Sequence, residues 1–358
     1  MSCHHWAKRA VRQCELTIVR TPKDNNFYVV SLQKMNLRRR QTLVTLASLS
    51  ALPSAVSNAS QLPSRLERPS QPGQHFSLRP SRFHGLAPRD LRLWLPPSFD
   101  RRQPYEVLLA HDGQNLFDPG YSYGGVPWGL DRTLERLLSE RLVRQVVVVG
   151  VPNSSQRFEE YAPQDPLEAL SPELWRLAYG SRSGTPAAAD FPGLANRYLA
   201  FLMETVLPES LGALGLQEPA HGISLMGSSM GGLISLYGLC KYPARVKQAA
   251  CLSTHWPMTV NADLLLKPHP SAEPIAQSYR DWLARHLPLA GMHRIYMDHG
   301  TLNLDGLYGT HQRQVNAIMK ARGYSEARDL RSLVFEGTDH NETSWAARLA
   351  TPMQFLFS

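Results

Sequence analysis

One serine of this chain lies in a sequence pattern that makes a hydroxyl group nucleophilic. The run Gly227-Ser228-Ser229-Met230-Gly231 is a G-x-S-x-G pattern with Ser229 at its centre. In this pattern a strand turns so sharply into a helix that the central residue is strained and its hydroxyl is exposed. Glycines on both sides of the serine leave out Cβ atoms that would collide in so tight a turn. The pattern therefore predicts that Ser229 is a nucleophile.

A serine hydroxyl is a weak nucleophile at neutral pH unless a base accepts its proton and a carboxylate orients that base. His340 is the candidate base, because it lies in the loop between the last predicted strand and the last predicted helix. Two aspartates compete as the acid: Asp298 ends the preceding predicted strand, and Asp305 lies beyond the next turn. A carboxylate at a strand end more often binds turn amides, so Asp305 is favoured and Asp298 is the alternative.

The oxyanion that forms during attack on a carbonyl group needs backbone N–H donors aimed at it. One donor is expected from Met230, the residue after the nucleophile, and the other from the loop after the third predicted strand. In that loop Asp112-Gly113 is a turn signal, and Gln114 N–H is the predicted donor. Three residues on loops expected to overhang the nucleophile are candidates for substrate binding, with core packing as the alternative for the aromatic side chains: Asn115, Trp128 and His255.

Alternating strand and helix patterns from about residue 75 onward place these side chains. The predicted strands are short apolar or β-branched runs: His75–Leu78, Leu91–Leu95, Glu106–Ala110, Gln145–Val151, Ile223–Met226, Gln248–Leu252, Arg294–Asp298 and Leu333–Phe335. The predicted helices have apolar residues at helical spacing: Leu130–Glu140, Ala195–Leu211, Met230–Lys241, His311–Arg322 and Thr343–Phe357. The alternation predicts an α/β class fold in a single domain, with a mostly parallel sheet of about eight strands flanked by helices.

Two connections, residues 152–192 and 257–288, are longer than this fold needs. Long excursions at the carboxyl ends of strands often wall a pocket, so substrate selectivity is expected to depend on them. Within the first connection, Arg157 is expected to form a structural ion pair with Glu159 or Glu160.

The positive charge of the chain comes from its N-terminal part. Of 38 Lys/Arg and 30 Asp/Glu, residues 1–59 hold nine and two, which leaves 29 against 28 in residues 60–358. A nearly neutral remainder does not support a nucleic-acid surface. The cysteines, Cys3, Cys14, Cys240 and Cys251, lack metal-ligand spacing, so no metal site is expected and the last two are interpreted as small buried thiols.

Residues 35–59 have the three regions of an export signal, namely three arginines at 38–40, a mildly apolar run, and small residues before a cleavage site at Ala59. The arginines and the low hydrophobicity resemble a twin-arginine signal, although the flanking residues depart from its usual consensus. The run is too short and too polar for a stable membrane span. We expect an exported protein, periplasmic or secreted, with a basic arm on a cytoplasmic protein as the alternative.

The predicted export signal divides the rest of the chain into a segment before it and two segments after it. Residues 1–34 show no sustained periodicity and are expected to be a disordered extension, which a true start at Met35 would also explain. Residues 60–74 contain several prolines and are predicted to be a linker. The folded domain is expected to occupy residues 75–358.

Five segments in order along the chain resemble the putative-esterase family of α/β-hydrolases. They are LLAHDGQNLFD (108–118), VVVGVPNSSQRFEEYAP (147–163), MGSSMGGLISLYGLCKYP (226–243), YMDHGTLNLD (296–305) and GTDHNETSW (337–345). The family includes enterochelin-type siderophore esterases, feruloyl and acetylxylan esterases, S-formylglutathione hydrolases and mycolyltransferases. The resemblance extends from about residue 75 to the end of the sequence.

This resemblance implies an α/β-hydrolase fold and a serine esterase that acts on a small-molecule ester through a covalent acyl-enzyme, without metal or organic cofactor. The implied triad and oxyanion donors are Ser229, Asp305, His340, Met230 and Gln114. In several members the acid follows the turn glycine more closely than here, where Asp305 is five residues beyond Gly300, and this keeps Asp298 open. The alternatives are an acyltransferase on the same triad and a non-catalytic binding protein.

Overall fold

The computed structural model describes residues 17–20, 27–30, 62–66, 71–180 and 193–358. The chain divides into two units, residues 1–59 and 60–358. The predicted export signal, residues 35–59, lies outside the described residues.

The first unit contains two short strands where the sequence predicts no regular structure. Strand β1 (Thr17–Arg20) pairs antiparallel with β2 (Phe27–Val30), with Thr17 opposite Val30. Both strands are rich in β-branched or aromatic residues, which favour extended backbone. The expectation of a featureless extension over residues 1–34 is therefore wrong for these two segments.

The second unit is built on one sheet of nine strands. They are β3 (Ser64–Leu66), β4 (Gln74–Leu78), β5 (Leu91–Leu95), β6 (Tyr105–His111), β7 (Gln145–Val151), β8 (Ile223–Ser228), β9 (Val246–Leu252), β10 (Arg294–Gly300) and β11 (Leu330–Phe335). Their order across the sheet is β11-β10-β9-β8-β6-β7-β5-β4-β3. The six strands from β11 to β7 in this order pair in parallel, whereas β5, β4 and β3 pair antiparallel with their neighbours. All eight predicted strands are found, and the prediction of a mostly parallel sheet is confirmed.

The ninth strand, β3, lies within the predicted linker, so the prediction of a linker is wrong for residues 64–66. Residues 64–66 pair antiparallel with β4 at the edge of the sheet, with Arg65 opposite Phe76. The carbonyl of Pro72 accepts a hydrogen bond from Trp94 Nε1 at 2.8 Å, and Gln71 Nε2 donates to the Phe117 carbonyl at 2.7 Å. The described part of residues 60–74 thus packs on the sheet through these hydrogen bonds. The prolines, from which a linker was predicted, do not prevent this pairing.

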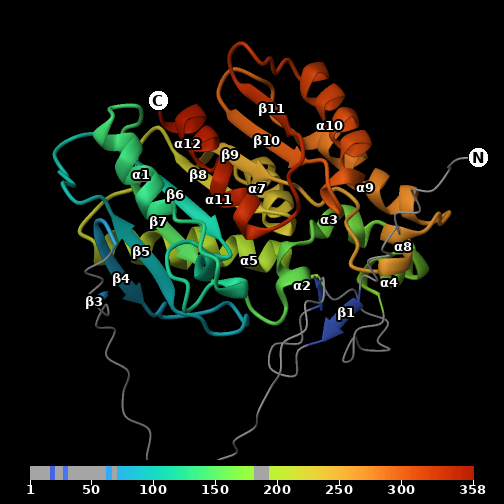
Figure 1. Cartoon of the computed structure of the whole chain (residues 1–358), viewed down its shortest axis with the longest axis horizontal. Helices are drawn as coiled ribbons and strands as arrows, with labels where there is room; N and C mark the ends of the chain where they lie inside the picture. Colours follow the sequence, from blue (N-terminus) through green and yellow to red (C-terminus); the bar gives the residue numbers. More distant parts are fainter. Residues whose placement is uncertain (1–16, 21–26, 31–61, 67–70, 181–192) are drawn as a thin grey trace, which may run out of the picture. The chain divides into compact units, whose positions relative to one another are not determined.

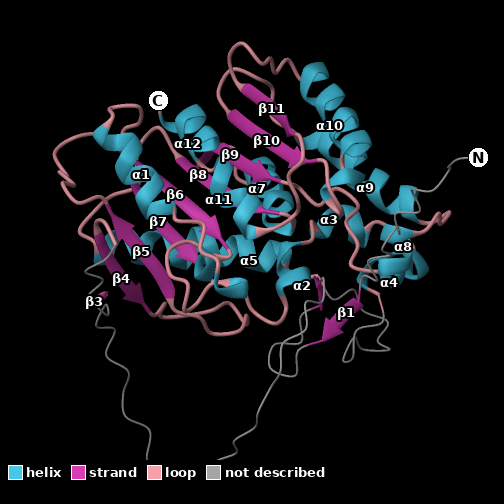
Figure 2. Cartoon of the chain, viewed as in Figure 1, coloured by secondary structure: helices cyan, strands magenta, loops and turns pink. Residues whose placement is uncertain are grey.

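Helices cover both faces of the sheet (Figures 1 and 2). They are α1 (Leu130–Ser139), α2 (Arg157–Tyr161), α3 (Gln164–Glu168), α4 (Pro172–Tyr179), α5 (Ala195–Phe201), α6 (Leu207–Ala213), α7 (Met230–Lys241), α8 (Ala262–Leu266), α9 (Ala272–His286), α10 (Gly309–Ala321), α11 (Glu342–Arg348) and α12 (Ala350–Phe357). No helix in this described part of the chain combines the length and apolarity that crossing a bilayer requires.

Two of the predicted helices are interrupted. A turn of π-helix, Leu202–Val206, separates α5 from α6, and Pro208 follows it in the first turn of α6. The predicted helix over residues 343–357 is divided at Leu349, three residues before Pro352. Proline lacks the backbone N–H that continues a helical ladder, and this accounts for both interruptions.

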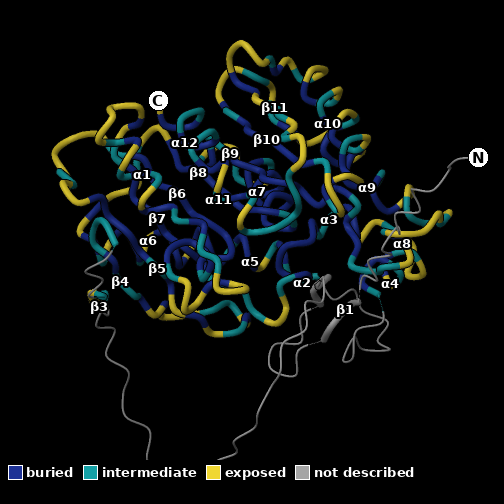
Figure 3. Tube along the Cα trace, viewed as in Figure 1, coloured by how far each residue is buried: buried dark blue, intermediate teal, exposed yellow. Residues whose placement is uncertain are grey.

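The strands divide their side chains between two cores, one on each face of the sheet. In β6 and β7 the residues Val107, Leu109, Val147, Val149 and Val151 belong to one core, and Leu108, Ala110, Val146 and Val148 belong to the other. This alternation is the two-residue period of a strand that is covered on both faces. Helices α1, α11 and α12 close the second core, and the remaining helices close the first. Figure 3 shows the central strands buried, whereas β11 at the edge is largely not.

A buried ion pair ties the chain before β5 to the first long connection. Arg89 donates to both carboxylate oxygens of Glu160 in α2, at 2.6 and 2.7 Å, and both side chains are almost fully buried. Ser154 Oγ donates to the same carboxylate at 2.8 Å. The start of this connection is therefore fixed to the body of the domain by charge as well as by apolar packing.

We predict that Glu160→Ala lowers the free energy of unfolding by about 3–5 kcal/mol, because Arg89 then remains buried without a counter-ion. The matched control is Glu140→Ala, which removes an exposed pair with Arg136 and is expected to change stability by less than about 0.5 kcal/mol. Urea unfolding of both variants measures the difference, and equal effects would contradict the assignment of Arg89–Glu160 as a structural pair.

Candidate active site

Ser229 forms the turn between β8 and α7. Its backbone has φ of 57° and ψ of -120°, which is a strained conformation for a residue with a side chain. A Cβ atom on Gly227 would lie 2.6 Å from the carbonyl carbon of Gly231, and one on Gly232 would lie 2.6 Å from Thr254 Oγ1. Ser229 is partly exposed between buried neighbours. The turn thus has the strain and the close backbone approach that the G-x-S-x-G pattern predicts, with Ser229 partly exposed.

The loop after β9 holds the backbone of this turn. Ser229 N–H donates to the carbonyl of Leu252 at 2.9 Å, and His255 N–H donates to the carbonyl of Ser229 at 3.1 Å. Ser253, between these two residues, has a positive φ of 41°. The turn is therefore bound to its neighbouring strand by backbone hydrogen bonds on both sides of Ser229.

An imidazole and a buried carboxylate meet at the ends of β10 and β11. His340 Nδ1 lies 2.6 Å from Asp305 Oδ1, and Asp305 is fully buried. The other carboxylate oxygen accepts hydrogen bonds from Ser253 Oγ and from Gly300 N–H, both at 2.7 Å. Burial alone would raise the pKa of Asp305, but the hydrogen bonds and the charge of His340 outweigh it and lower that pKa. Asp305 is therefore ionised at neutral pH and can stabilise a protonated imidazole.

Asp298 has different partners. Its carboxylate binds Arg348 through Nε and Nη2, both at 3.1 Å, and accepts a hydrogen bond from Tyr296 Oη at 2.8 Å. Ser253 N–H donates to it at 3.0 Å. Of the two aspartates that the sequence offers as the acid, Asp305 is the one that contacts His340, and Asp298 fixes the surrounding backbone.

Close contact between two loops brings His340 to Asp305. Thr301 and Leu302 donate their N–H groups to the carbonyl of Thr338 at 3.0 Å. A Cβ atom on Gly300 would lie 2.2 Å from that carbonyl oxygen, so this approach requires glycine. Asn341 caps α11 by accepting a hydrogen bond from Ser344 N–H, which fixes His340 just ahead of the helix.

Two aromatic side chains flank the imidazole. The His340 ring meets Tyr308 and Trp345 edge to face, with ring centroids 5.6 and 5.0 Å apart. Trp345 Nε1 also donates to Ser253 Oγ at 3.0 Å, which connects this packing to the carboxylate of Asp305. The orientation of the imidazole is therefore set by both a hydrogen bond and apolar contacts.

The loop after β6 lies beside the start of α7. Gly113–Asn115 forms a short 3-10 helix, and Asp112 before it has a left-handed φ of 54°. A Cβ atom on Gly231 would be 3.5 Å from an Asp112 carboxylate oxygen, which places this loop next to the turn at Ser229. Gln114 is partly exposed here, and its side-chain oxygen accepts a hydrogen bond from Asn153 N–H at 3.1 Å.

Arg157 fixes this loop, and its partner differs from the prediction. Arg157 donates to both oxygens of Asp112, at 2.8 and 2.7 Å, and to the carbonyl of Ser228 at 3.4 Å. The charge of Arg157 outweighs the effect of burial and lowers the pKa of Asp112. The expected pairing of Arg157 with Glu160 is wrong, because Glu160 is taken by Arg89, and the left-handed turn brings Asp112 into reach of Arg157 instead.

The three predicted substrate-binding residues are all buried. Asn115 Oδ1 accepts a hydrogen bond from Tyr123 N–H at 2.9 Å, and Trp128 packs against Trp345 with centroids 5.9 Å apart. Both ring nitrogens of His255 are occupied, by Tyr308 Oη at 2.6 Å and the Thr259 carbonyl at 2.7 Å. Burial lowers the pKa of His255 to about 3, so this imidazole is neutral at neutral pH. These contacts are structural, and a role in substrate binding stays a prediction.

The geometry agrees with a comparison to family models. The model described as "Putative esterase" matches residues 87–356. The chain belongs to this family. An uncharacterised protein of Bacillus subtilis, YbbA, is 23% identical over 175 residues, which are 48% of this chain and 60% of that protein. The chain therefore spans about 60% of the length of this curated relative.

Solved structures share the fold of this family member at low identity. The ferric enterobactin esterase of Salmonella typhimurium has a TM-score of 0.54 at 15% identity, over 81% of this chain and 59% of that one. An IroE-like serine hydrolase from Shewanella oneidensis has a TM-score of 0.51 at 16% identity, over 79% and 80% of the two chains. At these identities the likeness establishes the α/β fold.

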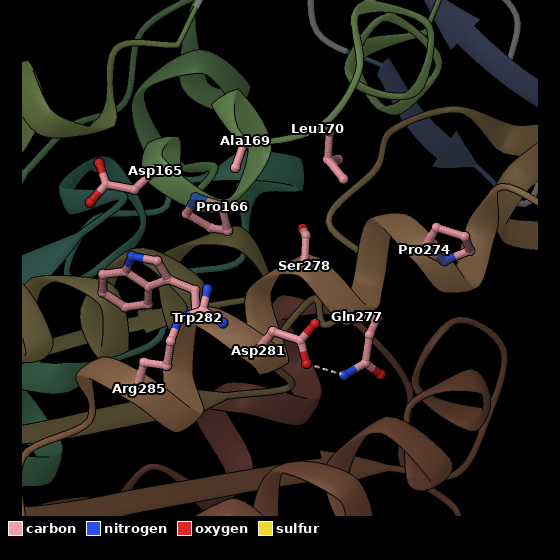
Figure 4. A pocket seen from close by; sticks show the side chains of 10 residues that line it. All are labelled: Asp165, Pro166, Ala169, Leu170, Pro274, Gln277, Ser278, Asp281, Trp282 and Arg285. Carbon is pink, nitrogen blue, oxygen red and sulfur yellow. Dashed lines mark hydrogen bonds between the residues drawn. The ribbon is translucent and has the colours of Figure 1, made fainter.

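The surface of the described residues has two pockets that concern the long connections and the ends of β10 and β11. One of about 300 Å³ lies between α3 and α9, where Asp165 and Pro166 face Trp282 and Arg285 (Figure 4). The other, of about 410 Å³, is lined by residues of the β10 and β11 ends and of α10, among them Asp305. The first lies between the two long connections, but its lining contains none of the predicted catalytic residues, and a role of these connections in substrate selectivity stays a prediction.

Several residues of the site carry no signal in the sequence. Ser253 and Arg348 both contact the aspartates at the end of β10, and they come from a loop and a helix far apart in the chain. Tyr308 lies outside the five family-like segments, and Trp345 ends one of them without a predicted role. The Asp-Gly signal at 112–113 predicted the turn but not the ion pair that fixes it.

We predict that Gly227→Ala lowers the free energy of unfolding by about 1–3 kcal/mol, because the new methyl group collides with the backbone of Gly231. The matched control is Gly212→Ala in α6, where a Cβ atom meets nothing within 4 Å. That change is expected to stabilise the protein by up to about 1 kcal/mol. Thermal and urea unfolding distinguish the two, and a neutral Gly227→Ala would contradict the close approach at the turn.

Proposed function

We propose that this chain hydrolyses carboxylic esters through a covalent acyl-enzyme on Ser229. The observation that carries the proposal is the 2.6 Å contact between His340 Nδ1 and buried Asp305, on the loops after β10 and β11, whose carboxyl ends lie at the same edge of the parallel sheet as the turn after β8. Membership of the esterase family supports the same chemistry, as do the esterase and serine hydrolase activities for which the Salmonella and Shewanella proteins are named.

In the first half of the reaction Ser229 Oγ attacks the ester carbonyl carbon while His340 Nε2 accepts its proton. Asp305 accepts a hydrogen bond from Nδ1–H, which selects the tautomer that leaves Nε2 free, and stabilises the imidazolium that forms. The oxyanion accepts hydrogen bonds from the N–H groups of Met230 and Gln114. Collapse of this intermediate breaks the bond to the alcohol, which leaves with the proton from His340.

In the second half a water molecule replaces the alcohol. His340 accepts a proton from the water as its oxygen attacks the acyl carbon, and the same two N–H groups hold the oxyanion. When the bond to Ser229 breaks, the serine oxygen takes the proton back and the carboxylic acid leaves. Transfer to an added alcohol in place of water would make the chain an acyltransferase, and analysis of products with and without acceptor alcohols separates the two.

We predict that Ser229→Ala reduces hydrolysis of 4-nitrophenyl acetate by at least about three orders of magnitude, as loss of a triad nucleophile does. The same variant should lose labelling by an alkyl fluorophosphonate, and peptide mass spectrometry of the parent should locate the label on Ser229. The control Ser139→Ala changes an exposed serine at the end of α1 and should leave both unchanged. Turnover and labelling that survive Ser229→Ala would refute the proposal, and a parent protein that does not label would indicate a binding role.

Replacing the acid gives a separate prediction. Asp305→Asn keeps the size of the side chain but removes its charge and lets the imidazole adopt the wrong tautomer, so kcat should fall by about three to four orders of magnitude. The control Asp263→Asn changes an exposed aspartate paired with Lys267 and should have no effect on kcat. A kcat within a few-fold of the parent in Asp305→Asn would assign the acid elsewhere.

A further inference from the structure

A second buried charge pair lies directly behind Asp305. Arg348, which is 4% exposed, binds both oxygens of Asp298 at 3.1 Å. The same guanidinium is 3.9 Å from Asp305 Oδ2. One cation therefore lies between two buried carboxylates, and only one of these carboxylates contacts the imidazole of His340.

The proposed role of His340 as a base depends on which of the two carboxylates, Asp298 or Asp305, pairs with the Arg348 guanidinium. A positive charge bound to Asp305 would reduce the negative potential that stabilises a protonated imidazole. The guanidinium has a bidentate partner in Asp298, which is the stronger geometry, and meets Asp305 at an ion-pair distance without a hydrogen bond. The observed arrangement therefore neutralises Arg348 with Asp298 and leaves the carboxylate of Asp305 to His340.

We propose that Asp298 is a positioning residue for the reaction: by holding Arg348, it keeps the guanidinium from pairing with Asp305 and so maintains the basicity of His340. This inference rests on the proposed function of the Ser229 site. It assigns a role to Asp298, which lies within β10 and does not touch the reacting atoms.

Ser253 separates the two pairs. Its hydroxyl donates to Asp305 Oδ2 at 2.7 Å and accepts hydrogen bonds from Arg348 Nη2 at 2.6 Å and Trp345 Nε1 at 3.0 Å. Its own N–H donates to Asp298. Ser253 adopts a positive φ of 41°, a conformation that costs energy for a residue with a side chain. The strain places one hydroxyl between the guanidinium and the carboxylate that would otherwise attract it.

Burial raises the pKa of Asp298, while Arg348, Ser253 N–H and Tyr296 Oη favour its charged form. Other ionisable side chains near His340 stay unchanged in the variants below: Asp339, Tyr308, His255 and Glu342. Burial raises the pKa of Glu342 to about 7, so each pH profile is also measured in a Glu342→Gln background. A shift that persists in that background belongs to His340.

The test is the pH dependence of the rate at which an alkyl fluorophosphonate labels Ser229, because this rate requires neutral His340 and no knowledge of the natural ester. In Asp298→Asn the unpaired guanidinium turns to Asp305 and disfavours the imidazolium. The acid limb of the profile should then move to lower pH by roughly 0.5–1 unit, and the plateau rate should fall because the base is weaker. In Asp298→Asn/Arg348→Met both charges are gone, and the limb should return to its position in the parent.

A merely structural role predicts a different result: lower stability and lower rates, with a limb that stays in place, and a further loss in the double variant. A folded Asp298→Asn whose limb does not move would overturn the inference, as would a double variant whose limb stays displaced. If Asp298→Asn alone does not fold, Asp298→Asn/Arg348→Lys, which keeps a cation, is compared with Asp298→Asn/Arg348→Met, which has none. A limb displaced to lower pH in the lysine variant and at the position of the parent in the methionine variant supports the inference, and limbs at the same pH in both overturn it.

The outcome for Ser229→Ala separates this inference from the proposed function. If labelling persists in Ser229→Ala, the proposed function fails. If labelling disappears in Ser229→Ala but the limb does not respond to Asp298→Asn, the proposed function stands and only the role of Asp298 is refuted.

Discussion

The hydrogen bond between His340 and Asp305 is the interaction on which the site depends, and the arrangement of the sheet makes it possible. β10 and β11 are parallel neighbours, so the loops that follow them leave the same edge of the sheet. Gly300 lets these loops touch, with two N–H groups on the carbonyl of Thr338. Asp305 then meets the imidazole at 2.6 Å while its other oxygen is bound by two donors. The buried carboxylate is thus ionised and fully hydrogen-bonded, which is the state that orients a base.

Close approach of backbones recurs on the other side of the site. The turn at Ser229 requires glycine at 227 and 232, and the 3-10 helix after β6 requires Gly113, where a Cβ atom would lie 2.4 Å from the carbonyl carbon of Gly150. These contacts leave no space for a side chain at positions 113, 227 and 232. The proposed nucleophile Ser229 and the proposed donor Gln114 lie within two residues of such a glycine. Asp112, Ser229 and Ser253, which lie in these loops, have positive φ, so the backbone of the site is strained at three residues with side chains.

The sequence predicted the elements whose signal is local. All eight strands were found because short apolar runs between turn residues indicate buried strands, and the loops carrying Ser229, Asp305 and His340 followed from the order of those strands. The helix interruptions ahead of Pro208 and Pro352 had a local signal in these prolines, but the helical spacing of apolar residues was given more weight.

What the sequence did not predict depends on pairs of residues far apart in the chain. Arg157 binds Asp112 and Arg89 binds Glu160, although closer partners for Arg157 were available in sequence. The pairing of Arg348 with Asp298 is of the same kind. Edge strand β3 was missed because its three residues gain their structure from pairing with β4 and have no periodicity of their own.

A crystal structure of the protein after reaction with an alkyl fluorophosphonate would show whether Ser229, His340 and the two N–H donors meet at one site. We expect phosphorus bonded to Ser229 Oγ, the phosphonyl oxygen within hydrogen-bond distance of Met230 N and Gln114 N, and His340 Nε2 facing the adduct with Nδ1 still bound to Asp305. An adduct on another residue, or an imidazole turned away from Ser229 with Asp305 bound to Arg348 in its place, would contradict this expectation.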